Sequence, residues 1–331
     1  MESSLATSDL ERLGRGALLQ SVRVVLDLPA GRDVLTPEGW GALRRVAARL
    51  GGDDRVAAVY SLASLGGERP PSRLALAALP DGARRSLVAP DRRAALLELV
   101  PQAGLDPTAV IQLARDVRRL SAAELSGIAG ARLRVGGLPA FRADYLDAVG
   151  GRFPLVVALI VGGTLAALAV GFRSLLIPLK AVGLNLLSVA AGFGAVVLVF
   201  QDGVGAGLLG ITPVDQVFAT VPPLVFCTVF GLSMDYEVFL VARIAEARRQ
   251  GVDEAEAIAE GLARTGPVIT NAAAIMVVVF GAFALGDLLV IRMLGLALAV
   301  AVLVDATVVR VAIGPALLAL AGRWNWWPGR G

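Results

Sequence analysis

The chain changes its hydrophobic pattern near residue 150. Residues 1–150 mix apolar and charged positions, whereas residues 151–322 hold nearly all of the long apolar runs. A helix needs about 20 apolar residues to cross the hydrocarbon core of a bilayer. Five segments qualify: 154–172, 175–200, 217–241, 267–285 and 290–320. The pattern therefore predicts a soluble domain over 1–150, a transmembrane domain over 151–322 and a short tail over 323–331.

The soluble part has a readable order of periodic segments. Alternating or apolar runs predict strands over 21–27, 55–62, 93–100 and 131–137, and helical spacing predicts helices over 36–50 and 107–119. This order gives strand-helix-strand twice, which matches the split βαβ, ferredoxin-like arrangement. The predicted fold class is an α+β domain followed by an all-α bundle of five transmembrane helices.

The placement of arginine predicts the orientation in the membrane. Four arginines crowd the connection 242–266, and others lie near residue 173 and in the tail, whereas the loop 201–216 has no lysine or arginine. Basic loops face the cytoplasm. We therefore expect a cytoplasmic C-terminus and residues 1–150 outside the cytoplasm. The connection 242–266 itself favours a polar helix, either along the cytoplasmic surface or as a solvated linker.

An external N-terminal domain requires a signal peptide or a preceding transmembrane helix for its export. Residues 1–30 contain neither, because the sequence MESSLATSDLERLGRG has no apolar core. We therefore expect a further segment to precede this chain.

Composition excludes several classes of function. The chain has no histidine, and its one cysteine, Cys227, lies inside an apolar span. Serine-histidine catalysis, histidine-ligated zinc, disulfides and cysteine-ligated metals are therefore excluded, and we expect no cofactor. The net charge of +3 comes without a dense basic cluster, so nucleic acid is not an expected partner. No Walker A sequence occurs, and proton chemistry must use carboxylates, tyrosine or water.

The third apolar span contains the sequence Asp235-Tyr236-Glu237. Asp235 lies eight residues before Arg243, about 12 Å from that end of the span. A carboxylate at this depth is costly, so it is paired, protonated or used to move charge. Burial disfavours its charged form, which makes Asp235 a candidate for exchanging protons. The alternative is a permanently protonated packing contact. Tyr236 is a candidate hydrogen-bond donor to a carboxylate on a facing helix.

Other polar residues in the spans allow two interpretations each. Glu237 lies nearer the interface and is expected to face water or to pair with a loop arginine. Thr270 and Asn271, early in the fourth span, could hydrogen-bond across helices in a functional or a purely structural role.

The last span contains Asp305 and Arg310. Five residues turn an α-helix by about 140° net, so the two are not expected to share a face. Each is expected to meet a partner on another helix or an internal water. They are candidates for a second charged layer in a proton path, or for a structural ion pair with a neighbouring span.

The spans and their flanks contain several distinctive motifs. They are GLSMDYEVFLVARI, GLARTGPVITNAAAIMVVVFGAFAL, LGLALAVAVLVDATVVR, the ending GRWNWW, and the stretches FRSLLIPLKAVGLNLLSVAAGFG and GGLPAFRADYLDAV. Together these motifs resemble the MmpL family of the RND transporter superfamily. The match covers about residues 130–328. Residues 1–130 resemble the family only as a plausible porter-like subdomain.

The resemblance implies a proton-driven exporter of lipids or other hydrophobic molecules in the bacterial inner membrane. In that family the Asp-Tyr pair of this span belongs to a proton relay, which falls on Asp235 and Tyr236. The family's Asp and Arg of the last helix fall on Asp305 and Arg310. A full member has two homologous halves, so this chain is similar to most of the C-terminal half without its first helix. The expected partners are membrane lipids, a hydrophobic substrate and the homologous N-terminal half, with protons as the coupling ion.

Two other functions are weighed against export. The chain could be a non-transporting half that acts as a membrane scaffold or partner subunit. An intramembrane aspartyl protease using Asp235 and Asp305 is more remote, because Gly-x-Gly-Asp is absent around both residues. Dependence of proteolysis on both aspartates would distinguish this enzyme from a transporter.

Overall fold

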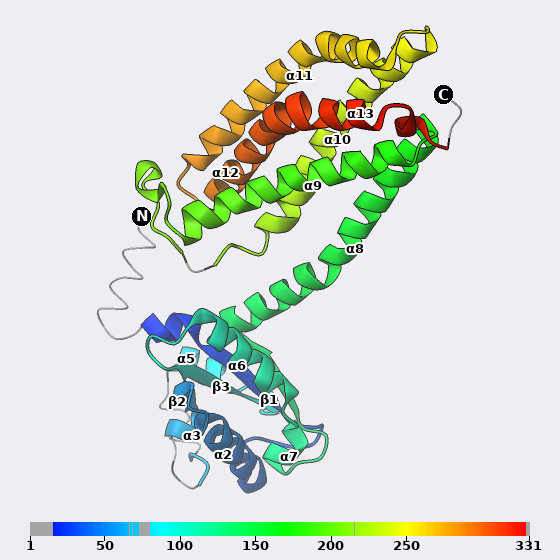
Figure 1. Ribbon diagram of the computed structural model, residues 1–331. Helices are drawn as coiled ribbons and strands as arrows, with labels where there is room; N and C mark the ends of the chain where they lie inside the picture. The colour runs from blue at the N-terminus through cyan, green and yellow to red at the C-terminus, as the bar shows by residue number, and fades with distance from the viewer. Residues whose placement is uncertain (1–15, 66, 68, 73–79, 215, 329–331) are drawn as a thin grey trace. The chain divides into compact units, whose positions relative to one another are not determined.

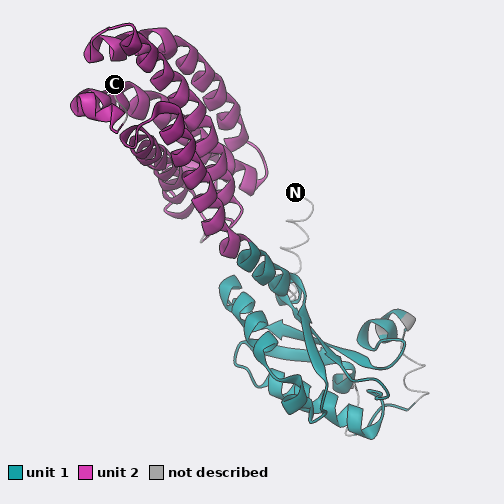
Figure 2. Cartoon of the chain, turned by 90° about the vertical axis from the view of Figure 1, so that its right-hand side faces the viewer, with its two compact units in different colours: residues 1–148 teal, residues 149–331 magenta. Residues whose placement is uncertain are grey.

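The computed structural model describes residues 16–65, 67, 69–72, 80–214 and 216–328 (Figure 1). The chain divides into two compact units, residues 1–148 and 149–331 (Figure 2). The boundary falls inside the long helix α8 (Leu138–Phe172), which belongs in part to each unit. Each unit has its own hydrophobic core and is described separately.

The first unit is built on a four-stranded antiparallel sheet. The strands β1 (Val22–Asp27), β2 (Val56–Ser61), β3 (Ala94–Pro101) and β4 (Arg132–Gly136) lie in the order β2-β3-β1-β4. Val24 pairs with Leu97 of β3 on one side and Val135 of β4 on the other. The helices α2 (Pro37–Gly51) and α6 (Pro107–Arg119) make the two crossovers. This order is that of the ferredoxin-like fold, so the α+β prediction is confirmed.

The sequence explains why these elements form where they do. Alternate residues of β1 are buried, which is the period of a strand with one covered face. Thr36 and Asp106 cap α2 and α6 by accepting hydrogen bonds from the backbone N–H groups of Gly39 and Thr108. Smaller helices α3 (Leu62–Leu65), α5 (Asp81–Leu87) and α7 (Ala122–Ser126) complete the unit, after a short 3₁₀ turn at Gly16–Gln20.

The second unit is a bundle of long helices. Five helical segments are long and apolar enough to cross a membrane: Leu138–Phe172, Leu176–Gln201, Val221–Arg249, Glu254–Ala284 and Leu289–Trp326. They correspond to α8, α9 (Leu176–Val196) with η2 (Val197–Gln201), α10 (Val221–Arg249), α11 (Glu254–Ala284), and α12 (Leu289–Val304) with its continuation. The chain is a multi-pass membrane protein, and the prediction of an all-α bundle of five spanning helices is confirmed.

The last helical segment changes its winding three times. After α12 it continues as the π-helix η4 (Asp305–Ile313), then as α13 (Gly314–Ala321), and ends in the 3₁₀ turn η5 (Gly322–Trp326). A further 3₁₀ turn, η3 (Ala206–Leu209), lies in the loop before α10.

The expected surface helix over 242–266 is not a separate element. The helix α10 extends to Arg249 and α11 begins at Glu254, so residues 250–253 alone connect them. The polar residues of this region extend the two spanning helices, because Asp253 caps α11 and Glu254 and Glu256 favour its first turn. The interpretation as an independent surface or linker helix was wrong.

The helices α9 and α12–η4–α13 run antiparallel in close contact. A Cβ at Gly192 of α9 would lie 2.7 Å from the carbonyl oxygen of Ala297. Further toward the start of α9, Ser188 contacts Asp305 and Lys180 contacts Leu317. As the residue number falls along α9, it therefore rises along the partner helix. This register fixes the depth at which polar residues of the two helices meet.

Candidate functional site

A buried ion pair lies in the middle of the helix bundle. The Nη2 atom of Arg310 lies 2.8 Å from Oδ2 of Asp305, and the two side chains are only 6% and 8% exposed. A charge transferred from water to such an environment is costly unless it is paired and hydrogen-bonded. The pair is therefore the main electrostatic feature of the bundle interior.

The two residues pair because the helix is wound differently there. Sequence reasoning placed Asp305 and Arg310 about 140° apart, with partners on other helices. In the π-helix η4 the backbone hydrogen bond runs from residue i to i+5, so residues five apart lie one above the other. The expectation of different faces was wrong, because the two residues pair with each other. The expectation that each also meets a group on another helix is confirmed.

Neighbouring helices supply the remaining contacts of the ion pair. The Ser188 hydroxyl of α9 donates to Oδ1 of Asp305 at 3.0 Å, and Arg310 donates to the backbone carbonyl of Ser233 on α10 at 3.0 Å. The guanidinium of Arg310 also lies over the ring of Tyr236, with 5.3 Å from Cζ to the ring centroid. The electron-rich face of the ring attracts the guanidinium in such a cation–π contact. Arg310 thus connects η4 to α10.

A small cavity lies beside this cluster between α10, α11 and the last helix. Ser233, Tyr236 and Asp305 form the polar part of its wall, and its remaining lining is Val229, Leu232, Ile269, Ala273, Met276, Val302 and Ala306. Ser233 and Tyr236 of α10 and Asp305 of the last helix therefore line the same cavity.

Asp235 and Glu237 lie on either side of Tyr236 and differ in their surroundings. Asp235 is exposed on the surface of the bundle and makes no hydrogen bond or ion pair with another residue of the described ranges. Glu237 is half-buried and lies within electrostatic range of Arg310 and Asp305. It is not ion-paired to a loop arginine in the part of the chain that the structure describes. Sequence reasoning did not anticipate that Glu237 approaches the ion pair.

Thr270 and Asn271 do not join this cluster. Both are exposed on α11, and neither forms a side-chain hydrogen bond among the residues placed by the structure. Thr265 of the same helix does form a side-chain hydrogen bond, because its hydroxyl donates to the carbonyl of Gly261 in the preceding turn. The roles assigned to Thr270 and Asn271, and those of the proton relay, stay predictions.

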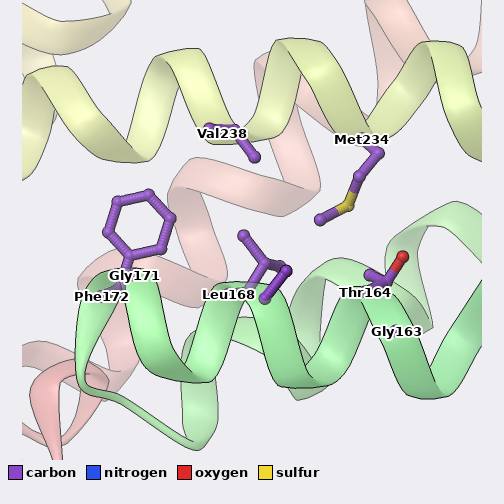
Figure 3. A pocket seen from close by; sticks show the side chains of 8 residues that line it. Gly163, Thr164, Leu168, Gly171, Phe172, Met234 and Val238 are labelled. Carbon is purple, nitrogen blue, oxygen red and sulfur yellow. The ribbon is translucent and has the colours of Figure 1, made fainter.

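An apolar groove lies on the other side of α10, against α8 (Figure 3). Met234 and Val238 form its α10 wall, and they flank the Asp235-Tyr236-Glu237 sequence. The α8 wall contains three residues with little or no side chain, Gly163, Ala167 and Gly171, together with Thr164, Leu168 and Phe172. We call the Asp305–Arg310 pair, together with Ser188, Ser233 and Tyr236, the charged layer. The Asp-Tyr-Glu segment therefore lies between the charged layer on one face of α10 and an apolar groove on another.

A second polar network joins the ends of several helices. Lys180 of α9 donates to the Asn325 side chain and to the carbonyl of Leu317, both at 2.7 Å. The amide of Asn325 donates in turn to Glu254 of α11 at 3.0 Å, and Glu254 also contacts Arg248 of α10 at 3.5 Å. The segment after the last helix thereby fixes the ends of α9, α10 and α11.

Sequence reasoning missed Ser188 and Ser233, which contact the Asp305–Arg310 pair, and the buried amide of Asn185. Ser188 and Asn185 are both completely buried on α9, and Ser233 contributes its backbone carbonyl. The signal was present for α9, because Asn185 and Ser188 are polar residues inside the apolar run AVGLNLLSVAAGFG. Polar residues within a span usually face the bundle interior.

A family model described as MMPL family matches residues 2–331 of the chain. The chain is 44% identical over 197 residues to a membrane protein of Streptomyces coelicolor, covering 60% of this chain and 28% of that one. It is 41% identical over 243 residues to the mycolic acid-containing lipids exporter MmpL11 of Mycolicibacterium smegmatis, covering 73% of this chain and 25% of the exporter. It is 42% identical over 215 residues to the heme uptake protein MmpL11 of Mycobacterium tuberculosis, covering 65% of this chain and 22% of that protein. The chain spans about a quarter of the length of these relatives.

Proposed function

The chain belongs to the MMPL family, and from this membership and the charged layer we propose that it is the C-terminal half of a proton-driven exporter. In this proposal Asp235 and Tyr236 take part in the proton relay, and the chain acts as a secondary active transporter and not as an enzyme. The proposed location is the bacterial inner membrane, with the sheet domain outside the cytoplasm and the C-terminus inside.

The observation that carries the proposal is the buried Asp305–Arg310 pair beside Tyr236. In the bundle interior, Arg310 lies within electrostatic range of two carboxylates, Asp305 and Glu237. When both carboxylates are ionised, this group of three carries one excess negative charge. An excess charge is costly inside a membrane and is removed by one proton. The charged layer is thus suited to bind and release protons.

The contacts of Arg310 supply a physical link between protonation and movement. Arg310 donates a hydrogen bond to the carbonyl of Ser233 and lies over the ring of Tyr236, both on α10. It also pairs with the carboxylate of Asp305 on η4. A proton that arrives on this group changes the charge that Arg310 has to balance. The attraction between α10 and the last helix then changes, and α10 shifts against η4. The free energy available is about 2.3 kcal/mol for one proton crossing 100 mV.

The exposure of Asp235 supports a partner across the bundle surface. A bare carboxylate is costly on a surface that faces hydrocarbon. We place the homologous half of the transporter against this face of α10, where it supplies the groups that exchange protons with Asp235.

The proposed substrate class is lipids or other hydrophobic molecules. The printed names of two relatives describe export of mycolic acid-containing lipids and uptake of heme, both of which are large and mainly apolar. The apolar groove next to Met234 and Val238 supports the same class, because an acyl chain would contact α10 beside the charged layer.

The test is the substitution Asp235→Asn in cells that make the chain at its natural level. Asparagine keeps the size of the side chain but does not exchange a proton, so export of a labelled mycolic acid-containing lipid should be abolished while the protein stays in the membrane. Glu246→Gln is the matched control, because Glu246 is an exposed acid of the same helix that pairs with Arg243. Normal export by Asp235→Asn would contradict the proposal. If Asp235→Asn exported normally while removal of the whole chain stopped export, the chain would be a scaffold.

A further inference from the structure

Two sets of buried polar atoms in the bundle have no hydrogen-bond partner among the described residues. They are both side-chain atoms of the Asn185 amide, Nδ2 and Oδ1, and the Nε and Nη1 atoms of Arg310. Asn185 is 0% exposed and Arg310 is 7% exposed. A buried polar group without a partner loses its hydration and gains nothing in return, and the loss is largest for a charged group. Native structures rarely leave such groups unsatisfied.

The helix register places these two sets of atoms at the same depth. Ser188 of α9 meets Asp305, and Lys180 of α9 meets Leu317. Asn185 lies between Ser188 and Lys180 on α9, and the two helices run antiparallel. The residues opposite Asn185 therefore lie between Asp305 and Leu317, a range that includes Arg310.

The chemistry of the two sets is complementary to a water molecule. Arg310 offers the N–H groups of Nε and Nη1 as donors, and Asn185 offers its amide NH₂ group as a donor and its carbonyl oxygen as an acceptor. A water oxygen accepts from the guanidinium and from the amide, and a water hydrogen donates to Oδ1 of Asn185. Buried waters typically make about three hydrogen bonds to groups that are otherwise unsatisfied. One water can thus give a hydrogen-bond partner to Asn185 and to Arg310 at the same time.

We propose that Asn185 and Arg310 together bind a buried water molecule, and that Asn185 is the positioning residue of this site. The site extends the charged layer from Ser188 and Asp305 through Arg310 toward Lys180 at the start of α9. If the proposed function holds, this water also carries the proton from the charged layer toward that end of the bundle. The water site itself does not depend on that function.

The direct test is a high-resolution electron cryo-microscopy structure of the unmodified full chain in its native assembly. The proposal expects a density peak within about 3.2 Å of the Asn185 amide and of Nε or Nη1 of Arg310. A direct hydrogen bond between Asn185 and Arg310 with no such peak would overturn it. This measurement does not require any variant to fold.

The second test is a double-mutant cycle on thermal unfolding. Asn185→Leu keeps the volume but removes the water's partners, so it should lower Tm by about 3 °C or more. In the background of Arg310→Met the same substitution should cost nothing or raise Tm, because no charged donors remain to be satisfied. A rise in Tm for Asn185→Leu alone would show that Asn185 has no partner in the native protein and would refute the water site. The matched control is Asn271→Leu on the exposed face of α11, which should leave Tm unchanged.

A third measurement separates the site from the proposed transport. Asn185→Leu should slow substrate-dependent proton uptake by reconstituted vesicles. If the density peak and the Tm coupling are found but proton uptake is unchanged, the water is structural and its role in the proton path is refuted. Loss of uptake in Asp235→Asn with a normal density peak would leave both proposals standing.

Discussion

At the scale of single residues, the energetics of the bundle interior depend on Arg310. Its guanidinium contacts the carboxylate of Asp305, the carbonyl of Ser233 and the ring of Tyr236. The attraction within a buried pair roughly balances the cost of removing both charges from water. The pair therefore adds little net stability, but each charge depends on the other. In the proposed relay, this dependence lets a single proton change the balance of the layer.

Removal of Arg310 alone should therefore be far more destabilising than removal of the whole pair. We expect Arg310→Met to lower the free energy of unfolding by about 3–5 kcal/mol, because Asp305 is left buried without its counter-charge. The double variant Asp305→Leu/Arg310→Met should recover most of that loss. Thermal or denaturant unfolding in detergent measures both effects.

The control for this prediction is an exposed pair on α10. Arg243 contacts Glu246 at 2.7 Å, and both side chains are largely exposed. Arg243→Met should change stability by about 1 kcal/mol or less, since surface pairs contribute little. If the double variant at Asp305 and Arg310 were no more stable than Arg310→Met, the unpaired charge of Asp305 would not be the cause of the destabilisation.

At the scale of elements, close contact between helices holds the charged layer at its depth. Gly192 of α9 leaves no room for a side chain, because its Cβ would lie 2.7 Å from the Ala297 carbonyl and 3.1 Å from the Ala301 methyl group. This approach brings α9 against α12 and lets the short side chain of Ser188 reach Asp305. Small residues at helix contacts are typical of membrane bundles.

We expect Gly192→Ala to separate α9 from α12 and to destabilise the bundle by about 1–3 kcal/mol, as overpacking does in cores. The Ser188–Asp305 hydrogen bond should be lost with it. Gly194→Ala two residues later is the matched control, because nothing lies within 4 Å of its added Cβ. Thermal unfolding of the two variants side by side tests the claim, and equal Tm values would refute it.

Periodicity in the sequence predicted most elements but not the winding of the last helix. The alternation at Val22–Asp27 and the capping residue Asp106 fixed elements of the sheet domain, and apolar length identified the five spans. A π-helix leaves the apolar pattern almost unchanged, so the spacing of Asp305 and Arg310 was interpreted on the α-helical period. The error reversed the conclusion about their pairing.

The candidate site was predictable by residue type more than by contact. The polar residues inside apolar spans were found at Asp235, Tyr236, Asp305 and Arg310, because charge at membrane depth is costly. Which of them meet depends on helix register, which a single sequence does not specify. For that reason the approach of Ser188 to Asp305 was not foreseen.

At the scale of the whole molecule, the chain corresponds to only part of the length of its relatives. It covers about a quarter of the length of the relatives, and Asp235 is exposed on the face of α10. In the proposed assembly that face meets the homologous half, so the relay is completed between the two halves. The charged layer described above would then be one side of the proton path.

The most direct test of this account is proton flow into liposomes that contain the chain in its native assembly. An imposed pH gradient and an internal pH-sensitive dye report the flow, with and without a labelled lipid substrate. We predict substrate-dependent proton flow in the unmodified protein and in Glu246→Gln, and no such flow in Asp235→Asn. Proton flow in Asp235→Asn that equals that of the unmodified protein would contradict the central claim.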